Sequence, residues 1–415
     1  MSVSPAVQPL PPSRFLLGLV ILLTGLGEMS TQIYAPALPA LAAGFGVGAV
    51  AVQATLSAFI IAFGCGQLVY GPLSDRFGRR PILLAGLGLY LLATLGCLMA
   101  SSVEELILAR ALQGGGACAA LVLARAITRD VWGKDAPPVI AVSTLAIAVS
   151  TVISPLAGGL LSATALGWRA SFVFLIVFGL AVTVAVVVGY RETHAKPDPE
   201  AIRPGRLLGN YAGLIGDAGY MGYALTLAFA YGALFAFISG APLVVVGRMG
   251  LAPWQYGASF GAVVSGLCLG MIAARTVTGA LGLRRTVALG AALMLAATIV
   301  ALGVGLAGWT NLPGLLLPQL PLTFGAGLVL PNAVAGAVMP QAQRAGLAAG
   351  LLGFLQMAGG AAFGFLVARL FDGTALPMLM IQVAAVSGLA LSFGLLVWRK
   401  RPTIPMATES LPRRP

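Results

Sequence analysis

Apolar stretches of about 20 residues alternate along the chain with short polar segments. A helix rises about 1.5 Å per residue, so each stretch can cross a hydrocarbon core of roughly 30 Å. The pattern predicts twelve spanning helices, near residues 15–38, 51–71, 81–100, 104–127, 137–161, 170–190, 217–243, 255–277, 286–307, 313–338, 346–369 and 376–398. We therefore expect an all-α integral membrane protein.

The longest polar interruption, at residues 191–216, divides the predicted helices into two groups of six. Its first part, RETHAKPDPEAIRPGRLLGN, is rich in proline and charge and shows no apolar face. The expected domains are therefore 1–190, a central cytoplasmic loop at 191–216, 217–398 and a cytoplasmic tail at 399–415. FGRRPILLAG (77–86) has a weaker counterpart in LGLRRTVALG (281–290), which indicates two homologous halves. Such repeats are typical of transporters that bind substrate near the membrane midplane.

Composition supports the membrane assignment, because 59% of the residues are hydrophobic and only 9% are charged, against about a quarter in soluble domains. A net charge of +12 could suit nucleic acid, but the basic residues gather in short segments between the apolar blocks. With both termini cytoplasmic, 18 of the 24 Lys and Arg fall on the cytoplasmic side and three on the other. This bias predicts that orientation and argues against a nucleic-acid partner.

Metal, cofactor and enzymatic chemistry find little support in the sequence. The four cysteines lie inside apolar runs, and the one histidine, His194, lies in the central loop. No nucleophile–base pair or soluble domain is evident. We therefore expect no cofactor and a transporter rather than an enzyme.

Residues 71–81, GPLSDRFGRRP, resemble the signature loop between the second and third helices of the major facilitator superfamily. The matching positions assigned to gating are Gly71, Asp75, Arg76, Gly78, Arg79 and Arg80. We expect Gly71 to permit close helix approach, and the charges to form a clasp at the cytoplasmic surface. A pairing of Asp75 with Arg125 is expected to contribute to this gate. A role in topology alone would explain the arginines but not Asp75 and the glycines.

Two further segments resemble motifs of drug:proton antiporters. ARALQGGGACAALVLARAITRDVW (109–132) carries Arg110, Gln113 and Gly114 in the fourth-helix positions, and its RAITRD ending is similar to the Bcr/CflA subgroup. VISPLAGGLL (152–161) resembles the fifth-helix motif, with Pro155 and Gly159 as gating positions.

The resemblance implies an exporter of small molecules in exchange for protons, in a bacterial-type inner membrane. It also implies that Arg110 takes part in proton coupling. A monomer is expected, because the repeat within one chain needs no partner subunit. The lipid bilayer, protons and a small-molecule substrate are the expected partners. The cargo does not follow, because one family accommodates many substrates.

Glu28 is the only carboxylate expected near the membrane midplane. Burying it costs several kcal/mol, which makes it a candidate proton carrier. Desolvation would favour its neutral form and a nearby Arg110 its charged form, so movement of Arg110 could control the proton. A structural role is the alternative, with Glu28 bound to Arg110 or to a hydroxyl.

The chain departs from the Bcr/CflA pattern at one position. That pattern usually has Asp two residues before the Tyr of Y-x-P-x-x-P; here Tyr34, Pro36 and Pro39 match, but Gln32 replaces the Asp. Glu28 lies one turn away, about 6 Å along the helix. Either the carboxylate moved and kept its role, or coupling changed and Glu28 recognises a cationic cargo.

A sparse set of polar and aromatic groups is expected to line a central cavity suited to amphipathic, drug-sized molecules. The candidates are Gln32, Tyr34, Gln113, Tyr231, Phe235, Asn332 and Gln356. Ordinary helix packing is the alternative for the aromatic pair. A second hypothesis is a transporter of one specific metabolite with weak or no proton coupling, in which Glu28 or Arg110 recognises a charged cargo.

Overall fold

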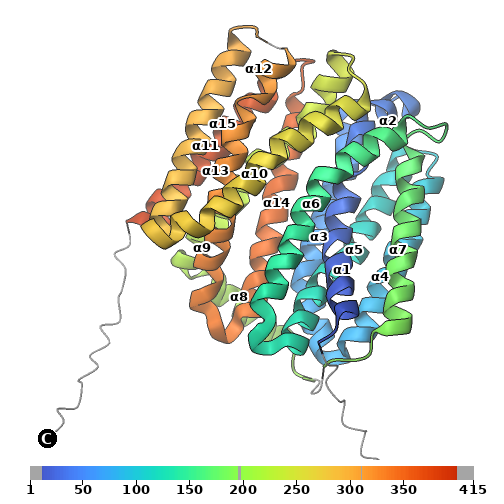
Figure 1. Cartoon of the computed structure of the whole chain (residues 1–415), viewed down its shortest axis with the longest axis vertical. Helices are drawn as coiled ribbons and strands as arrows, with labels where there is room; N and C mark the ends of the chain where they lie inside the picture. The colour runs from blue at the N-terminus through green and yellow to red at the C-terminus, as the bar shows by residue number, and fades with distance from the viewer. Residues whose placement is uncertain (1–11, 195–197, 310, 400–415) are drawn as a thin grey trace, which may run out of the picture.

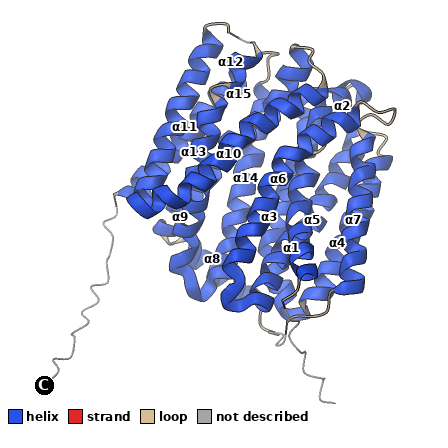
Figure 2. Ribbon diagram, viewed as in Figure 1, coloured by secondary structure: helices blue, strands red, loops and turns tan. Residues whose placement is uncertain are grey.

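The computed structural model of the chain describes residues 12–194, 198–309 and 311–399. Every regular element in this part of the chain is helical (Figure 2). The tail expected at 399–415 lies, beyond Arg399, outside the described residues.

Two sets of helices lie on either side of the central linker (Figure 1). The first set is α1 (Arg14–Gln32), α2 (Leu38–Phe45), α3 (Ala49–Phe77), α4 (Arg79–Met99), α5 (Val103–Trp132), α6 (Ala136–Ser162) and α7 (Arg169–Gly189). The second set is α9 (Ala218–Pro242), α10 (Pro253–Leu281), α11 (Leu283–Leu306), α12 (Leu312–Leu316), α13 (Gln319–Val338), α14 (Ala345–Leu370) and α15 (Leu376–Phe393).

Eleven helical spans in the described residues are long and apolar enough to cross a membrane. The helix α6, 27 residues long, completes the twelve expected. We call the end of the bundle that carries the linker and the α3–α4 connection the linker end, and the opposite end the far end.

The first predicted helix is longer than expected and is interrupted. Pro36 and Pro39 have no backbone N–H, so α1 ends at Gln32, a 3₁₀ turn follows at Ala35–Ala37, and α2 continues to Phe45. The prediction of one helix at 15–38 was therefore wrong at its C-terminal end.

Residues 191–210 of the linker were predicted to have no apolar face, but the linker as a whole has one. It contains α8 (Pro204–Ile215), in which Leu207, Tyr211 and Leu214 share one side of the helix. The Tyr211 hydroxyl donates a hydrogen bond of 3.0 Å to the carbonyl oxygen of Leu68 on α3. The apolar positions begin at Leu207 and continue to Leu214, so the segment 191–210 contains only the first of them.

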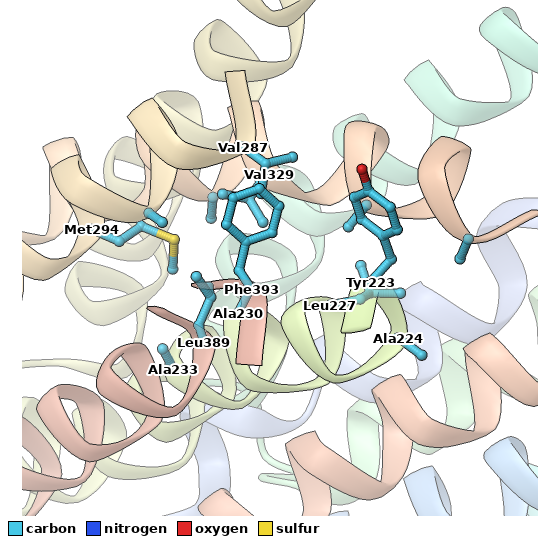
Figure 3. Close-up of a cluster of buried hydrophobic side chains, with 14 of the residues drawn as sticks. Tyr223, Ala224, Leu227, Ala230, Ala233, Val287, Met294, Val329, Leu389 and Phe393 are labelled. Atoms are coloured by element: carbon cyan, nitrogen blue, oxygen red, sulfur yellow. The ribbon is translucent and has the colours of Figure 1, made fainter. Parts of the chain in front are cut away.

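Each half has its own apolar core. In the second half, Tyr223 and Leu227 of α9 pack with Val287 of α11, Val329 of α13 and Phe393 of α15 (Figure 3). The halves meet through small residues, as in many membrane bundles. At the far end, a side chain on Gly159 of α6 would collide with the backbone of Pro253 at the start of α10.

Close packing inside the first half, between α3 and α5, can be tested at two neighbouring glycines of α5. A Cβ on Gly114 would collide with the carbonyl group of Phe59 on α3, whereas a Cβ on Gly115 would meet nothing within 4 Å. We expect Gly114→Ala to cost roughly 1–3 kcal/mol, because the opposing group is backbone. Gly115→Ala is the matched control and should leave the melting temperature unchanged or slightly higher. Thermal unfolding of the purified protein in detergent measures both; equal melting temperatures would contradict this account of the α3–α5 contact.

Candidate functional site

Glu28 lies half-buried on α1, 14 residues from the start of the helix and so roughly 21 Å along it. Its Oε1 accepts hydrogen bonds from Nε2 of Gln32 at 3.2 Å and from Oγ1 of Thr151 on α6 at 3.1 Å. Thr151 was missed by the sequence analysis, although it is a hydroxyl one turn before Pro155 in a mostly apolar helix. Two helices of the first half therefore hold this carboxylate.

The second half reaches the same place through Tyr231 of α9. This half-buried side chain lies close enough to Glu28 for the two groups to interact electrostatically. Its ring centroid is 5.9 Å from that of Phe235, which is fully buried and packs against Gly360 of α14. Glu28 and Tyr231 thus lie where the two halves meet, with Phe235 packed behind them.

Arg110 of α5 is fully buried in the first half. Its Nη1 donates to the carbonyl oxygen of Ser30 at 3.1 Å and to Oε1 of Gln113 at 2.5 Å. The guanidinium carbon lies 4.5 Å from the ring centroid of Tyr34 and 4.2 Å from that of Phe59. Two aromatic faces and two oxygens therefore stabilise this cation, while its Nε and Nη2 have no partner among the described residues.

Gln113 and Tyr34 belong to this buried network. Nε2 of Gln113 donates to Thr94 at 2.9 Å, and the Tyr34 hydroxyl shares a hydrogen bond of 2.5 Å with Thr55. Both side chains are fully buried. Their assignment to substrate binding stays a prediction, because in this conformation protein atoms enclose them.

Opposite faces of α1 separate the two ionisable groups. Residues four apart share a face, so Glu28 and Gln32 point one way and Ser30 and Tyr34 another. The first pair faces α6 and the second half; the second pair faces Arg110. No ion pair joins Glu28 to Arg110 in the described structure.

Two further residues of the second half, Asn332 and Gln356, were predicted to line the cavity, and this stays a prediction. Asn332 of α13 is buried, accepts a hydrogen bond from Thr278 at 3.0 Å, and donates to the carbonyl of Leu328 at 2.9 Å. Its amide is thus bound within the second half. Gln356 is half-buried on α14, next to Met357, whose side chain packs on Gly64 of α3.

The predicted gate is built around Arg79, which is 3% exposed. Its Nη1 donates to Asp75 at 2.5 Å and its Nε to Asp130 at 3.0 Å. The expected pairing of Asp75 with Arg125 is therefore not formed; Arg125 is exposed near the end of α5. Asp75 and Arg79 are one turn apart across the α3–α4 turn, so the shorter contact is the local one.

Gly71 does not permit a close helix contact in this conformation, because a Cβ there would meet nothing within 4 Å. Gly78 is needed for the turn, since its φ of 96° is disfavoured for other residues. Arg76 lies over the ring of Phe77, and Arg80 donates to the carbonyl of Val187 at 3.0 Å.

Glu192 of the linker is a further part of this gate. Its two carboxylate oxygens accept hydrogen bonds from the backbone N–H groups of Arg79 and Arg80, at 2.9 and 3.0 Å. These N–H groups belong to the first turn of α4. A carboxylate is stabilised there by N–H donors that lack intrahelical acceptors and by the helix dipole. No sequence signal indicates this contact, because more than 100 residues separate the partners.

Pro155 and Gly159 lie where α6 meets α10 at the far end. A Cβ on Gly257 would collide with the carbonyl oxygen of Pro155, as one on Gly159 would with Pro253. Their contacts join the two halves, and their gating role stays a prediction.

Two sets of six spanning helices, apart from the short α2 and α12, with one half-buried carboxylate near their interface define a multi-pass membrane transporter. The chain belongs to the Major Facilitator Superfamily, whose sequence profile matches residues 20–364. It is 34% identical to Multidrug resistance protein D of Escherichia coli (strain K12), over 86% of this chain and 89% of that protein. It is 30% identical to the Bicyclomycin resistance protein homolog of Haemophilus influenzae, over 88% and 92%. These relatives confirm the resemblance to the Bcr/CflA subgroup.

Solved structures support the same fold. A bacterial homolog of the human lysosomal transporter Spinster, inward-facing and occupied, matches with a TM-score of 0.68, over 95% of this chain and 96% of that one. The human organic anion transporter MFSD10 matches with a TM-score of 0.65, over 93% and 100%. Identities of 14% and 20% show a shared fold and nothing more specific.

The Arg79 cluster can be tested through its two acids. The side chain of Asp130 is 17% exposed and that of Asp75 is 42% exposed. Water screens the less buried pair more strongly, so we expect Asp130→Asn to lower the free energy of unfolding by about 1–3 kcal/mol and Asp75→Asn by less. Denaturation of the purified variants measures this ranking. Equal losses would show that Asp130 has no special place in the cluster.

Proposed function

We propose that this protein exports small hydrophobic or amphipathic compounds from the cytoplasm in exchange for protons, by alternating access. Relatives named for resistance to bicyclomycin and, in Pseudomonas aeruginosa, to chloramphenicol support cargo of this kind. The chloramphenicol resistance protein is 34% identical over 57% of this chain.

The position of Glu28 is the observation that carries the proposal. It is the one acid inside the described spans that lies away from a helix end, and it lies between the halves. Its hydrogen bond to Thr151 and its electrostatic interaction with Tyr231 of the second half make its surroundings depend on how the halves are arranged. A carboxylate whose hydration changes with conformation can take up a proton in one state and release it in another.

Arg110 is assigned a supporting part in proton coupling. Its buried charge favours the ionised form of any carboxylate that approaches it. Because Arg110 is fully enclosed, direct recognition of an anionic cargo by its guanidinium has less support. A transporter of one specific metabolite that is recognised by Arg110 therefore has less support. A transporter in which Glu28 recognises a cationic cargo remains the competing hypothesis.

Alternating access is supported by the contacts between halves. The helices α6 and α10 touch at the far end, through Pro155, Gly159, Pro253 and Gly257. In Figure 1 they cross there and separate toward the linker end. We assign the linker end to the cytoplasm, following the distribution of Lys and Arg, in the inner membrane of a bacterial cell. Both halves belong to one chain, so a single chain suffices for the cycle.

Replacement of Glu28 tests the proton carrier. A stability screen that includes chloramphenicol and bicyclomycin first identifies a bound cargo. In vesicles with an imposed pH gradient, we expect Glu28→Gln to reduce gradient-driven transport of that cargo to background while its binding persists. Glu104→Gln, which removes an exposed carboxylate at the start of α5, is the matched control. Normal gradient-driven transport by Glu28→Gln would exclude Glu28 as the carrier.

Moving the carboxylate from position 28 to position 32 tests whether an acid one turn away on α1 can also carry the proton. The double variant Glu28→Gln, Gln32→Glu keeps one acid on the same face of α1. We expect it to restore part of the gradient-driven transport that Glu28→Gln loses. Cargo binding that is lost in Glu28→Gln, together with transport indifferent to pH in the unmodified protein, would favour recognition of a cation.

The orientation can be tested by labelling single cysteines in a background without the native four. Gly205 in α8 and Gly373 in the α14–α15 connection are both exposed or half-exposed and lie at opposite ends. We expect a membrane-impermeant maleimide to label Gly373→Cys in intact cells and Gly205→Cys only after permeabilisation. The reverse pattern would overturn the assignment of the linker end to the cytoplasm.

A further inference from the structure

The α3–α4 turn of the first half recurs in the second half with the same backbone but different charges. The helices α3 and α10 both have 29 residues and both are followed by a glycine with positive φ, Gly78 at 96° and Gly282 at 78°. The next helix then starts at once. In this register Arg80 corresponds to Arg284, Pro81 to Arg285, and Asp75 to Gly279.

The first of these turns shows what its backbone binds. N–H groups of the first two residues of α4 donate to the carboxylate of Glu192. The corresponding residues at the start of α11 are Leu283 and Arg284, where the helix dipole stabilises an anion. The same cradle in the second half is therefore suited to an anion.

A cavity of about 500 Å³ lies at this second turn. Arg284 and Arg285 line it together with Tyr223, whose side chain interacts with Arg284. Apolar side chains form the rest of the wall, among them Leu281 at 43% exposure and Met339 at 74%. Cationic and exposed apolar groups thus share one cavity at the end of a membrane span.

The charge of the second half also favours an anion. Between Asp217 and Asp372 the sequence contains six arginines and no acidic residue. A free phosphate ion would use only the cationic part of the cavity, whereas a phospholipid would also cover Leu281 and Met339. Basic groups at a membrane boundary attract anionic lipids.

We propose that the cavity between α10, α11 and α13 at the linker end binds the phosphate headgroup of an anionic phospholipid. The headgroup lies against Arg284, Arg285 and the N-terminus of α11. An acyl chain then follows Leu281 and Met339 into the bilayer. Such a lipid occupies in the second half the place that Glu192 occupies in the first.

Native mass spectrometry of the full chain in neutral detergent can test this site. We expect dioleoyl phosphatidylglycerol to form one saturable adduct and dioleoyl phosphatidylcholine to bind at least tenfold more weakly. The double variant Arg284→Gln, Arg285→Gln should weaken phosphatidylglycerol binding roughly tenfold or more, since each arginine contributes about 1 kcal/mol. Arg14→Gln, which removes an exposed cation from the same end of the bundle, should not.

A second variant separates the cavity from its charge. Met339→Trp narrows the apolar part of the cavity and keeps both arginines, so it should also weaken phosphatidylglycerol binding. If the double variant fails to fold, this variant tests the proposal on its own. Unchanged affinity in both variants, or an equal loss in Arg14→Gln, would overturn the proposal. Equal binding of phosphatidylcholine, or displacement of the lipid by millimolar inorganic phosphate, would overturn the assignment to an anionic phospholipid.

Discussion

The guanidinium of Arg110 has no exposed surface, so protein groups alone must stabilise its charge inside an apolar bundle. Its partners are Ser30 of α1, Tyr34 just after α1, Phe59 of α3 and Gln113 of α5. These contacts set how α1, α3 and α5 lie against one another. They also fix the rotation of α1 about its axis, and the location of Glu28 follows from that rotation.

With one face of α1 turned toward Arg110, the other presents Glu28 to α6 and to the second half. The two ionisable groups are thereby kept apart, one inside a half and the other between halves. Glycines let the backbones of the two halves approach closely where α6 meets α10. In the proposed cycle, a rearrangement of the interface between the halves changes the surroundings of Glu28, including its distance from the charge of Arg110.

The linker end shows how one backbone geometry serves two charge patterns. In the first half, Asp75, Asp130 and Glu192 enclose Arg79 and the N-terminus of α4. In the second half, the same turn carries two arginines beside a cavity. The first arrangement is closed by the chain itself, and the second requires an anion from outside it under our proposal.

The lengths of the apolar segments determined the helical class and the number of spans, because a bilayer permits few other folds for twenty-residue apolar segments. The polar gap at 191–216 and the internal repeat indicated the two halves. The apolar pattern also singled out Glu28 and Arg110, since charge in such segments is rare. Only the tertiary structure decided their partners. It placed Thr151 and Tyr231 beside Glu28, gave Arg79 rather than Arg125 to Asp75, and brought Glu192 to α4. Side-chain pairing depends on how helices rotate and pack, and a one-dimensional pattern of polarity does not record that rotation.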